Sequence, residues 1–523
     1  MKTFLLLILI LSGQLVYAQP WIRYYGQGQN AIAKYVTEQY DKGYLIAGSI
    51  NLSTYAWLVK TDVNGNLLWD KKFGNGNYNT ILSNVEQTFD GGFILCGATQ
   101  KLSSHDAILL KLNPCAEVEW CKILEGPNNY EYGRMVKQTF DGGYIVLTAY
   151  YPTIPESNIS LFKFNPTGEL VWHQFYPYEF FYNQDTPYDL QVDSVSYFIS
   201  ASRNYADTLT GNPAFSGSYF ISTDTAGVKQ WDMIYGKNKY YYSDPWRTTR
   251  NSRGKYYHSC THSSNTETNP GLIWINHVGS EAGDKDIFET ASPNFCGLST
   301  ITILNDTNLV FFGGFTINGT FQWQVLKTDT LGNILKSSSI PEVIVHNSTT
   351  KTFDDKFMTV GDDTFNNKFR IVALKVNSNL EYDSIYTQPF TYDSLCPYPI
   401  VSDTLDPNCD NIIVSVDEPF KKPETTQLKV YPNPADKMLT IELPKYLVVT
   451  NNRGNIPATT VYHQWSSATL QAIDLQGKIV LQQEVANNGI PLQLDVSQLP
   501  AGMYEFSLMY KGKRVAGSKV VVE

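Results

Sequence analysis

Short apolar runs separated by turn residues recur along most of the chain, and none has the length or period of a helix of consequence. In one example, the runs at 82–87, 93–99, 107–112 and 118–123 predict four consecutive strands. The second and third runs are the most apolar, as expected for strands packed between neighbouring layers. Phe-Asp-Gly-Gly joins the first two runs, and an Asp/Asn-x-x-Gly type of turn joins the last two.

This four-strand pattern repeats about every fifty residues. The turn around Asp41 recurs around Asp90 and Asp141 as Thr-Phe-Asp-Gly-Gly. The second turn begins at seven similarly spaced residues: Asp62, Asn113, Asn165, Asp224, Asn276, Asp329 and Asn377. Seven such units predict a seven-bladed β-propeller over residues 19–390. A solenoid is the alternative, but it would need polar capping units, and the terminal units are not distinctively polar.

The N-terminal segment 21–26 resembles residues 69–74, the outermost strand of a unit, yet no inner strands precede it. An open ring would leave two exposed strand edges. We therefore expect residues 21–26 to pair with the last unit and close the ring.

A smaller β-sandwich is predicted for residues 427–523, after a proline-containing linker at 391–426. Leu439, Ile441 and Leu443 alternate with polar positions, as in a half-buried strand. Further runs at 473–485, 503–509 and 515–522 supply the other strands, whereas residues 445–467 look like an insertion. The fold class is therefore all-β, a propeller followed by a sandwich.

The sandwich carries three motifs in a fixed order, whose residues are Tyr431, Pro432, Asn433, Pro434, Gly477, Gly502 and Tyr504. They resemble the type A C-terminal sorting domain of the type IX secretion system of Bacteroidota. A generic carbohydrate-binding or immunoglobulin-like module is the alternative. The resemblance implies export by the type IX machinery to the outer surface or the medium, with processing in the linker. The propeller-like repeats also resemble arrays found in secreted Bacteroidota proteins with this domain.

The N-terminus agrees with export. Lys2, the apolar residues 4–11 and Val16-Tyr17-Ala18 predict a signal peptide over residues 1–18. Neither this run nor any other approaches the ~20 residues of a membrane-spanning helix. We expect a secreted or surface protein that passes through the periplasm.

Composition narrows the partners. Only 17% of residues are charged, 14% are aromatic, and the net charge is −10. Nucleic acid and anionic membrane surfaces require basic patches, so neither is expected as a partner. Abundant rings favour β-structure and recognition surfaces.

Seven cysteines suggest disulfides in an oxidising compartment. Cys396 and Cys409 flank a short polar segment and are the disulfide candidate. Cys115 and Cys121 lie on either side of one turn and could also pair. The other three, Cys96, Cys260 and Cys296, are expected to be small core residues.

Candidate chemistry is sparse. His258, Cys260 and His262 share one face of a strand, but without a fourth ligand we expect two surface histidines around a buried cysteine. The Asp-Gly-Gly turns offer one carboxylate each, too few for calcium. The sequence has no nucleophile elbow, His-Glu-x-x-His, phosphate loop or dinucleotide motif, so no catalytic residue, metal or cofactor is predicted.

Two aromatic loops between outer and inner strands give the ligand-site hypothesis. We expect them on adjacent blades and on one face, forming a platform for a sugar or a peptide. Its residues are Tyr176, Tyr178, Phe181, Asn183, Tyr240, Tyr241, Tyr242, Asp244 and Trp246. Ordinary packing between blades is the alternative. The expected function is non-catalytic binding of a glycan, peptide or protein; the other reading is a polysaccharide hydrolase or lyase at the propeller mouth.

Overall fold

The computed structural model has two compact units, formed by described residues up to 413 and from 428 onward. All the regular elements formed by the residues that the structure describes are β-strands. Within the described part of the chain, no helix is long and apolar enough to span a bilayer. The structure describes residues 20–101, 104–125, 131–150, 158–176, 185–206, 213–235, 242–263, 268–287, 297–317, 320–342, 345–413, 428–443, 447–451, 459–463, 467–474, 478–486, 490–510 and 513–523.

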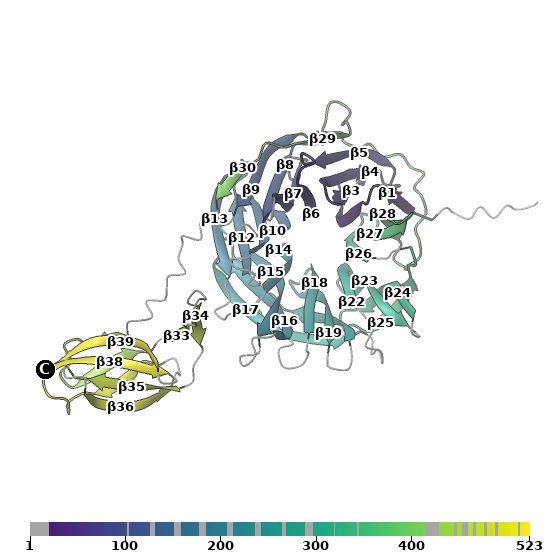
Figure 1. Cartoon of the computed structure of the whole chain (residues 1–523). Helices are drawn as coiled ribbons and strands as arrows, with labels where there is room; N and C mark the ends of the chain where they lie inside the picture. Colours follow the sequence, from purple (N-terminus) through teal and green to yellow (C-terminus); the bar gives the residue numbers. More distant parts are fainter. Residues whose placement is uncertain are drawn as a thin grey trace, which may run out of the picture. The chain divides into compact units, whose positions relative to one another are not determined.

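Seven antiparallel sheets form a ring in the larger unit, which is a β-propeller (Figure 1). Each blade takes its strands consecutively from the centre outward. Blades 1 to 3 are β2 (Ile32–Glu38), β3 (Tyr44–Ile50), β4 (Tyr55–Thr61) and β5 (Leu67–Phe73); β6 (Asn79–Gln87), β7 (Phe93–Lys101), β8 (Ser104–Leu112) and β9 (Val118–Glu125); and β10 (Glu131–Gln138), β11 (Tyr144–Tyr150), β12 (Asn158–Phe164) and β13 (Leu170–Tyr176).

Blades 4 to 7 continue the same order. They are β14 (Asp185–Val192), β15 (Ser196–Ala206), β16 (Pro213–Asp224) and β17 (Lys229–Tyr235); β18 (Tyr242–Arg250), β19 (Tyr256–Ser263), β20 (Thr268–Ile275) and β21 (Ala282–Asp286); β22 (Gly297–Asn305), β23 (Asn308–Ile317), β24 (Thr320–Asp329) and β25 (Ile334–Ser339); and β26 (Val345–Lys351), β27 (Phe357–Phe365) and β28 (Lys368–Val376).

The ring is closed by the N-terminal strand, as predicted. Strand β1 (Ile22–Tyr25) pairs antiparallel with β28 and so completes blade 7. Trp21, next to this strand, is fully buried and donates its indole N–H to the Val63 carbonyl of blade 1 at 2.9 Å. The first and last strands of the ring therefore meet within blade 7 and give it its fourth strand.

Every inner strand contains a register shift that gives it one extra residue, a β-bulge, at an equivalent place. Asn84, Asp189 and Ser348 each follow such a bulge. Their side chains accept a backbone N–H bond from the next blade, at 3.0, 2.8 and 3.3 Å. The bulge thus turns a side chain sideways and ties neighbouring inner strands together.

Neighbouring blades also pack together where the tryptophan of one outer strand lies against a turn glycine of the next blade. Gly227 has φ +78°, and a Cβ added there would lie 2.8 Å from the Trp172 ring of the preceding blade. Gly168 and Gly279 lie against the indoles of Trp120 and Trp231 in the same way. Glycine in this turn therefore provides the left-handed backbone and also the close approach of the ring.

The predicted linker is ordered through residue 413. Strand β29 (Asp403–Leu405) pairs parallel with β5, and β30 (Asp410–Ile413) pairs parallel with β9 (Figure 1). We call residues 391–413 the strap. Its prolines do not prevent pairing because the two paired segments are short and lie at the outer edges of blades 1 and 2. The linker prediction for 391–413 was therefore wrong.

The smaller unit contains a three-stranded and a four-stranded sheet around one apolar core. The first has the order β31 (Lys429–Tyr431), β32 (Met438–Glu442) and β37 (Leu492–Asp495). The second has the order β36 (Ile479–Ala486), β35 (Ser467–Ile473), β38 (Gly502–Tyr510) and β39 (Lys513–Val522). A separate hairpin, β33 (Leu447–Asn451) with β34 (Thr459–His463), occupies the sequence predicted as an insertion.

Candidate functional site

The predicted aromatic platform is only partly within the described residues. Tyr176 ends β13, is buried, and donates its hydroxyl to the Gly227 carbonyl at 2.7 Å. It is a core residue between blades 3 and 4, so its assignment to an exposed platform was wrong. The backbone of Tyr242, Asp244 and Trp246 lies in inner strand β18, which corrects the predicted loop. The remaining members, Tyr178, Phe181, Asn183, Tyr240 and Tyr241, lie outside the described residues.

The histidine cluster of β19 is buried, not at the surface as expected. His258, Cys260 and His262 have at most 1% exposure. His258 Nδ1 lies 2.7 Å from Thr248 Oγ1, and His262 Nδ1 lies 2.5 Å from Asp286 Oδ1. Burial lowers the pKa of His258 to about 3, so this imidazole is neutral. No group of side chains suited to a metal is found among the residues described.

A cavity of about 80 Å³ lies where the inner strands converge. Ligand pockets usually measure roughly 300–1,000 Å³, so this one suits a few water molecules. Six of the seven inner strands contribute to its wall. The lining residues are Tyr35, Met135, Lys137, Asp189, Gln191, Arg247, Thr248, Thr300, Ile301, Ser348 and Thr349.

The charged residues that line this cavity hold neighbouring inner strands together. Asp189 accepts backbone N–H bonds from Thr248 at 2.8 Å and Leu190 at 2.9 Å. Burial raises the pKa of Asp189, although Arg247 acts in the opposite direction. Lys137 lies 3.3 Å from a carboxylate oxygen of Glu86 on the neighbouring blade. We therefore expect these contacts to stabilise the packing of neighbouring blades.

The disulfides differ from the predicted pairs. Cys396 bonds Cys115, and Cys409 bonds Cys121, across sequence separations of 281 and 288. The strap runs along blades 1 and 2, which brings its two cysteines to Cys115 and Cys121 of blade 2. The local pairing of Cys396 with Cys409 was therefore wrong. Cys96 and Cys260 are buried, as expected, and Cys296 lies outside the described residues.

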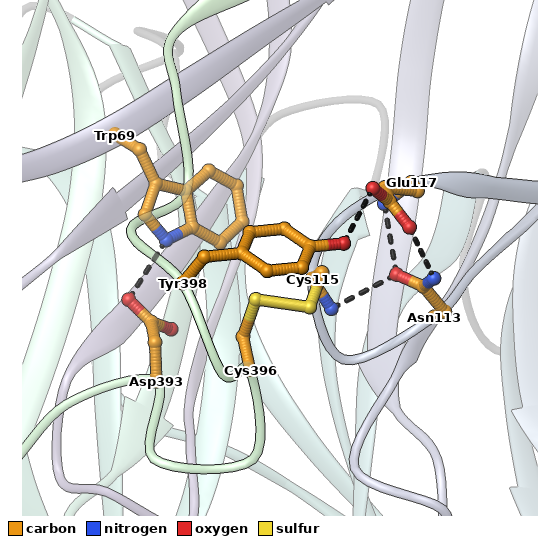
Figure 2. The surroundings of a disulfide bond; sticks show 7 residues. All are labelled: Trp69, Asn113, Cys115, Glu117, Asp393, Cys396 and Tyr398. Carbon is orange, nitrogen blue, oxygen red and sulfur yellow. Dashed lines mark hydrogen bonds between the residues drawn. A yellow bond between two sulfur atoms is a disulfide. The ribbon is translucent and has the colours of Figure 1, made fainter.

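The first disulfide joins the strap to the β8–β9 turn of blade 2, close to Trp69 of blade 1 (Figure 2). Trp69 donates its indole N–H to Asp393 at 2.9 Å, and the Tyr398 hydroxyl donates to Glu117 at 2.8 Å. A pocket of about 500 Å³ lies beside this contact. Its lining residues are Leu68, Trp69, Tyr392, Asp393, Ser394, Cys396, Pro397, Tyr398, Pro399 and Ile400.

The Asp-Gly-Gly turns contain ion pairs that the sequence analysis missed. Asp41 and Lys60 are both buried and lie 2.7 Å apart. Asp90 pairs with Lys111, and Asp141 with Lys163, each at 2.9 Å. The signal was present, because a lysine recurs two positions before each Asp/Asn turn in these repeats. The aspartate joins the first turn of a blade to its third strand.

Two of the three sorting motifs, far apart in sequence, both contact strand β39. Asn433 donates its amide N–H to the Lys519 carbonyl at 3.0 Å and accepts the Val521 N–H at 2.9 Å. Gly502 pairs with Val522, and the buried Tyr504 donates its hydroxyl to the Pro500 carbonyl at 2.6 Å. Tyr431, Pro432 and Pro434 flank this contact, whereas Gly477 lies outside the described residues. The motif therefore binds the last strand, β39.

Comparison with known proteins identifies this unit. Residues 429–523 match the family model of the secretion system C-terminal sorting domain, which implies handling by the type IX system and secretion or surface attachment. No curated protein matches the sequence.

Similar solved structures have low identity. An ulvan lyase, described as a new family of polysaccharide lyase, is 9% identical with a TM-score of 0.46, covering 68% of this chain and 96% of its own. Drosophila Semaphorin 2a is 8% identical with a TM-score of 0.42, and the match covers 97% of this chain and 99% of the semaphorin chain. The Nup133 β-propeller domain of Vanderwaltozyma polyspora is 10% identical with a TM-score of 0.37, covering 61% and 89%.

Proposed function

We propose that this protein is a non-catalytic β-propeller that the type IX system exports and that binds a glycan, peptide or protein outside the cell. The observation that carries the proposal is the small size of the cavity where the inner strands converge, about 80 Å³. A polysaccharide hydrolase usually needs two carboxylates on either side of the scissile bond. Asp189, the carboxylate that lines the described cavity, is held by two backbone N–H groups. A cavity of about 80 Å³ is also too small for a sugar unit and its neighbours.

Export supports an extracellular ligand. The sorting domain covers residues 429–523, and the propeller precedes it as the exported body. A net charge of −10 disfavours polyanionic ligands. The surface of the ring is therefore where we place the ligand.

A paired screen for binding and turnover tests this proposal. The purified chain is applied to a glycan array with a calcium chelator present, and the same polymers are assayed for release of reducing ends and unsaturated products. Binding without product is expected. Release of product from any polymer would contradict the proposal and support a hydrolase or lyase. In that case Asp189→Asn, compared with Asp232→Asn on outer strand β17, would show whether the cavity is the site.

A further inference from the structure

The first hairpin turn of four consecutive blades, 7, 1, 2 and 3, presents an aromatic side chain to solvent. These are Phe353, Tyr40, Phe89 and Phe140, with exposed fractions of 42%, 43%, 74% and 68%. We call them the aromatic arc. Each lies five positions after the first residue that resumes pairing beyond the bulge of the inner strand, so all four occupy the same place in the repeat. Single exposed rings are ordinary, but a row on adjacent blades indicates a binding surface.

The arc covers only part of the ring. The equivalent residues of blades 4, 5 and 6 are Ser194, Ser252 and Asn305, which are polar and exposed. Packing within a blade therefore does not require an aromatic residue at this place. For Phe353, ring contacts with Tyr386 and Phe390 at 6.1 and 5.9 Å between centroids supply part of the reason. For Tyr40, Phe89 and Phe140, a ligand that lies over blades 1 to 3 supplies one.

Hydrogen bonds between blades hold the arc in place. The backbone N–H of Phe353 donates to Glu38 at 2.8 Å, and that of Tyr40 to Gln87 at 2.9 Å. The N–H of Phe89 donates in the same way to the Gln138 side chain at 2.6 Å. Three of the four turns are thus fastened to the next blade. Because the turns are already ordered, a ligand would lose little affinity to ordering them.

A fixed hydrogen-bond acceptor follows each of the two most exposed rings. The Asp90 and Asp141 side chains are 52% and 65% exposed, although each is bonded to a lysine at 2.9 Å. Each also accepts a backbone N–H within its own turn. Burial is the largest single influence on Asp141 and opposes its ionisation, but the hydrogen bonds from Thr139, Lys163 and Gly143 together with the Lys163 charge lower its pKa to about 2. The pKa of Asp90 is lowered by corresponding bonds. These carboxylates therefore remain ionised acceptors near neutral pH.

Ring and carboxylate together indicate the chemistry of the ligand. A sugar ring has an apolar face that stacks on an aromatic ring and hydroxyls that donate to a carboxylate. The rings of the arc are separated by aspartate and glycine, so their apolar area is broken up and fits a continuous apolar protein surface poorly. Exposed carboxylates repel anionic polymers. A repeated subsite on adjacent blades suits a polymer of repeated units.

We propose that the aromatic arc binds an uncharged polysaccharide, whose sugar rings stack on Phe89, Phe140 and their counterparts on blades 7 and 1. The inference rests on the proposed binding function and narrows its ligand to a neutral glycan chain. It places the ligand on the turns of the repeat motif and not on the loops between blades.

Affinity electrophoresis of the full chain tests this site. Native gels contain mixed-linkage β-glucan, glucomannan, xylan or starch, with alginate as the anionic polymer. The test variant is Phe89→Ala/Phe140→Ala. Val195→Ala, which is 71% exposed in the blade 4 turn, and Phe365→Ala, which is 43% exposed at the β27–β28 hairpin, are the matched controls. Thermal melting verifies that every variant is folded.

We expect the wild type and both controls to be retarded by at least one neutral polymer, and the double variant to bind it roughly tenfold more weakly. Asp141→Asn should bind with intermediate affinity. Equal retardation of wild type and double variant would overturn the arc as the site but leave glycan binding intact. Retardation by alginate alone, or by none of the polymers, would overturn the neutral-glycan inference itself, and binding of array peptides or proteins in the earlier screen would then identify the other ligand class.

Discussion

Removal of both strap disulfides should destabilise the propeller more than the two separate removals add up to. Cys115–Cys396 and Cys121–Cys409 close loops with separations of 281 and 288 residues. For loops of this length, the chain-entropy relation gives about 6 kcal/mol when one bond acts alone. Once one bond has formed, the other closes a loop of only roughly 20 residues, which contributes about 3 kcal/mol. Either bond alone therefore supplies most of the stabilisation that the two bonds supply together.

We therefore expect Cys115→Ser/Cys396→Ser and Cys121→Ser/Cys409→Ser to lose about 3 kcal/mol each, and the variant with all four serines about 9 kcal/mol. Urea unfolding followed by tryptophan fluorescence measures the three losses. Removing cysteines in bonded pairs avoids a new unpaired thiol, and wild-type protein in reducing buffer should behave like the four-serine variant.

Additive losses would refute the shared-loop reasoning, because the bonds would then constrain independent loops. Peptide mapping of the oxidised protein supplies a second check. It should recover peptides that join Cys115 with Cys396 and Cys121 with Cys409. Recovery of the local pair Cys396–Cys409 would refute the arrangement of the strap.

Three further predictions concern the ring, and one concerns the tail. Trp21→Ala should cost about 3–5 kcal/mol in urea unfolding, because a fully buried indole that closes the ring is lost; a cost below about 1 kcal/mol would contradict its role. Gly227→Ala should lower the melting temperature more than Gly142→Ala, because both have positive φ but only Gly227 faces an indole at 2.8 Å; equal shifts would remove the packing argument. Since burial lowers the pKa of His258 to about 3, the unfolded chain binds a proton that the folded chain does not as pH falls below about 6.5. Stability should therefore fall with acidification from 6.5 toward 3, by up to about 1.4 kcal/mol per pH unit from this group, and less steeply in His258→Gln; identical pH profiles would be inconsistent with this. Deletion of 427–523 should leave the propeller folded but in the periplasm, and normal amounts at the surface by immunoblot would count against the sorting role.

The repeat could be predicted from sequence because its signals are local. Strand period and turn chemistry act over a few residues, and their recurrence around Asp41, Asp90 and Asp141 is visible without any contact map. Ring closure by residues 22–25 followed from the resemblance of that segment to an outer strand, and the pairing of β1 with β28 confirms it. The sorting domain was recognisable because its motifs are short and ordered, and the family match to 429–523 confirms it.

The errors share one physical cause, which is that distance in the folded chain is unrelated to separation in sequence. Cys396 and Cys409 are near one another along the chain, yet the strap carries each to a different partner on blade 2. Tyr176 lies in an aromatic run like its neighbours, but the end of β13 turns its ring into the interface between blades 3 and 4.

The sequence alone determined the architecture and the destination of this protein, since strand period, turn residues and sorting motifs are encoded within short segments. Tertiary structure decided which side chains are available. Phe89 was only a turn residue in the repeat, and the fold left its ring exposed in a row with those of neighbouring blades. Exposure, pairing of ions and pairing of cysteines depend on which blades become neighbours, because each requires atoms from distant segments to meet.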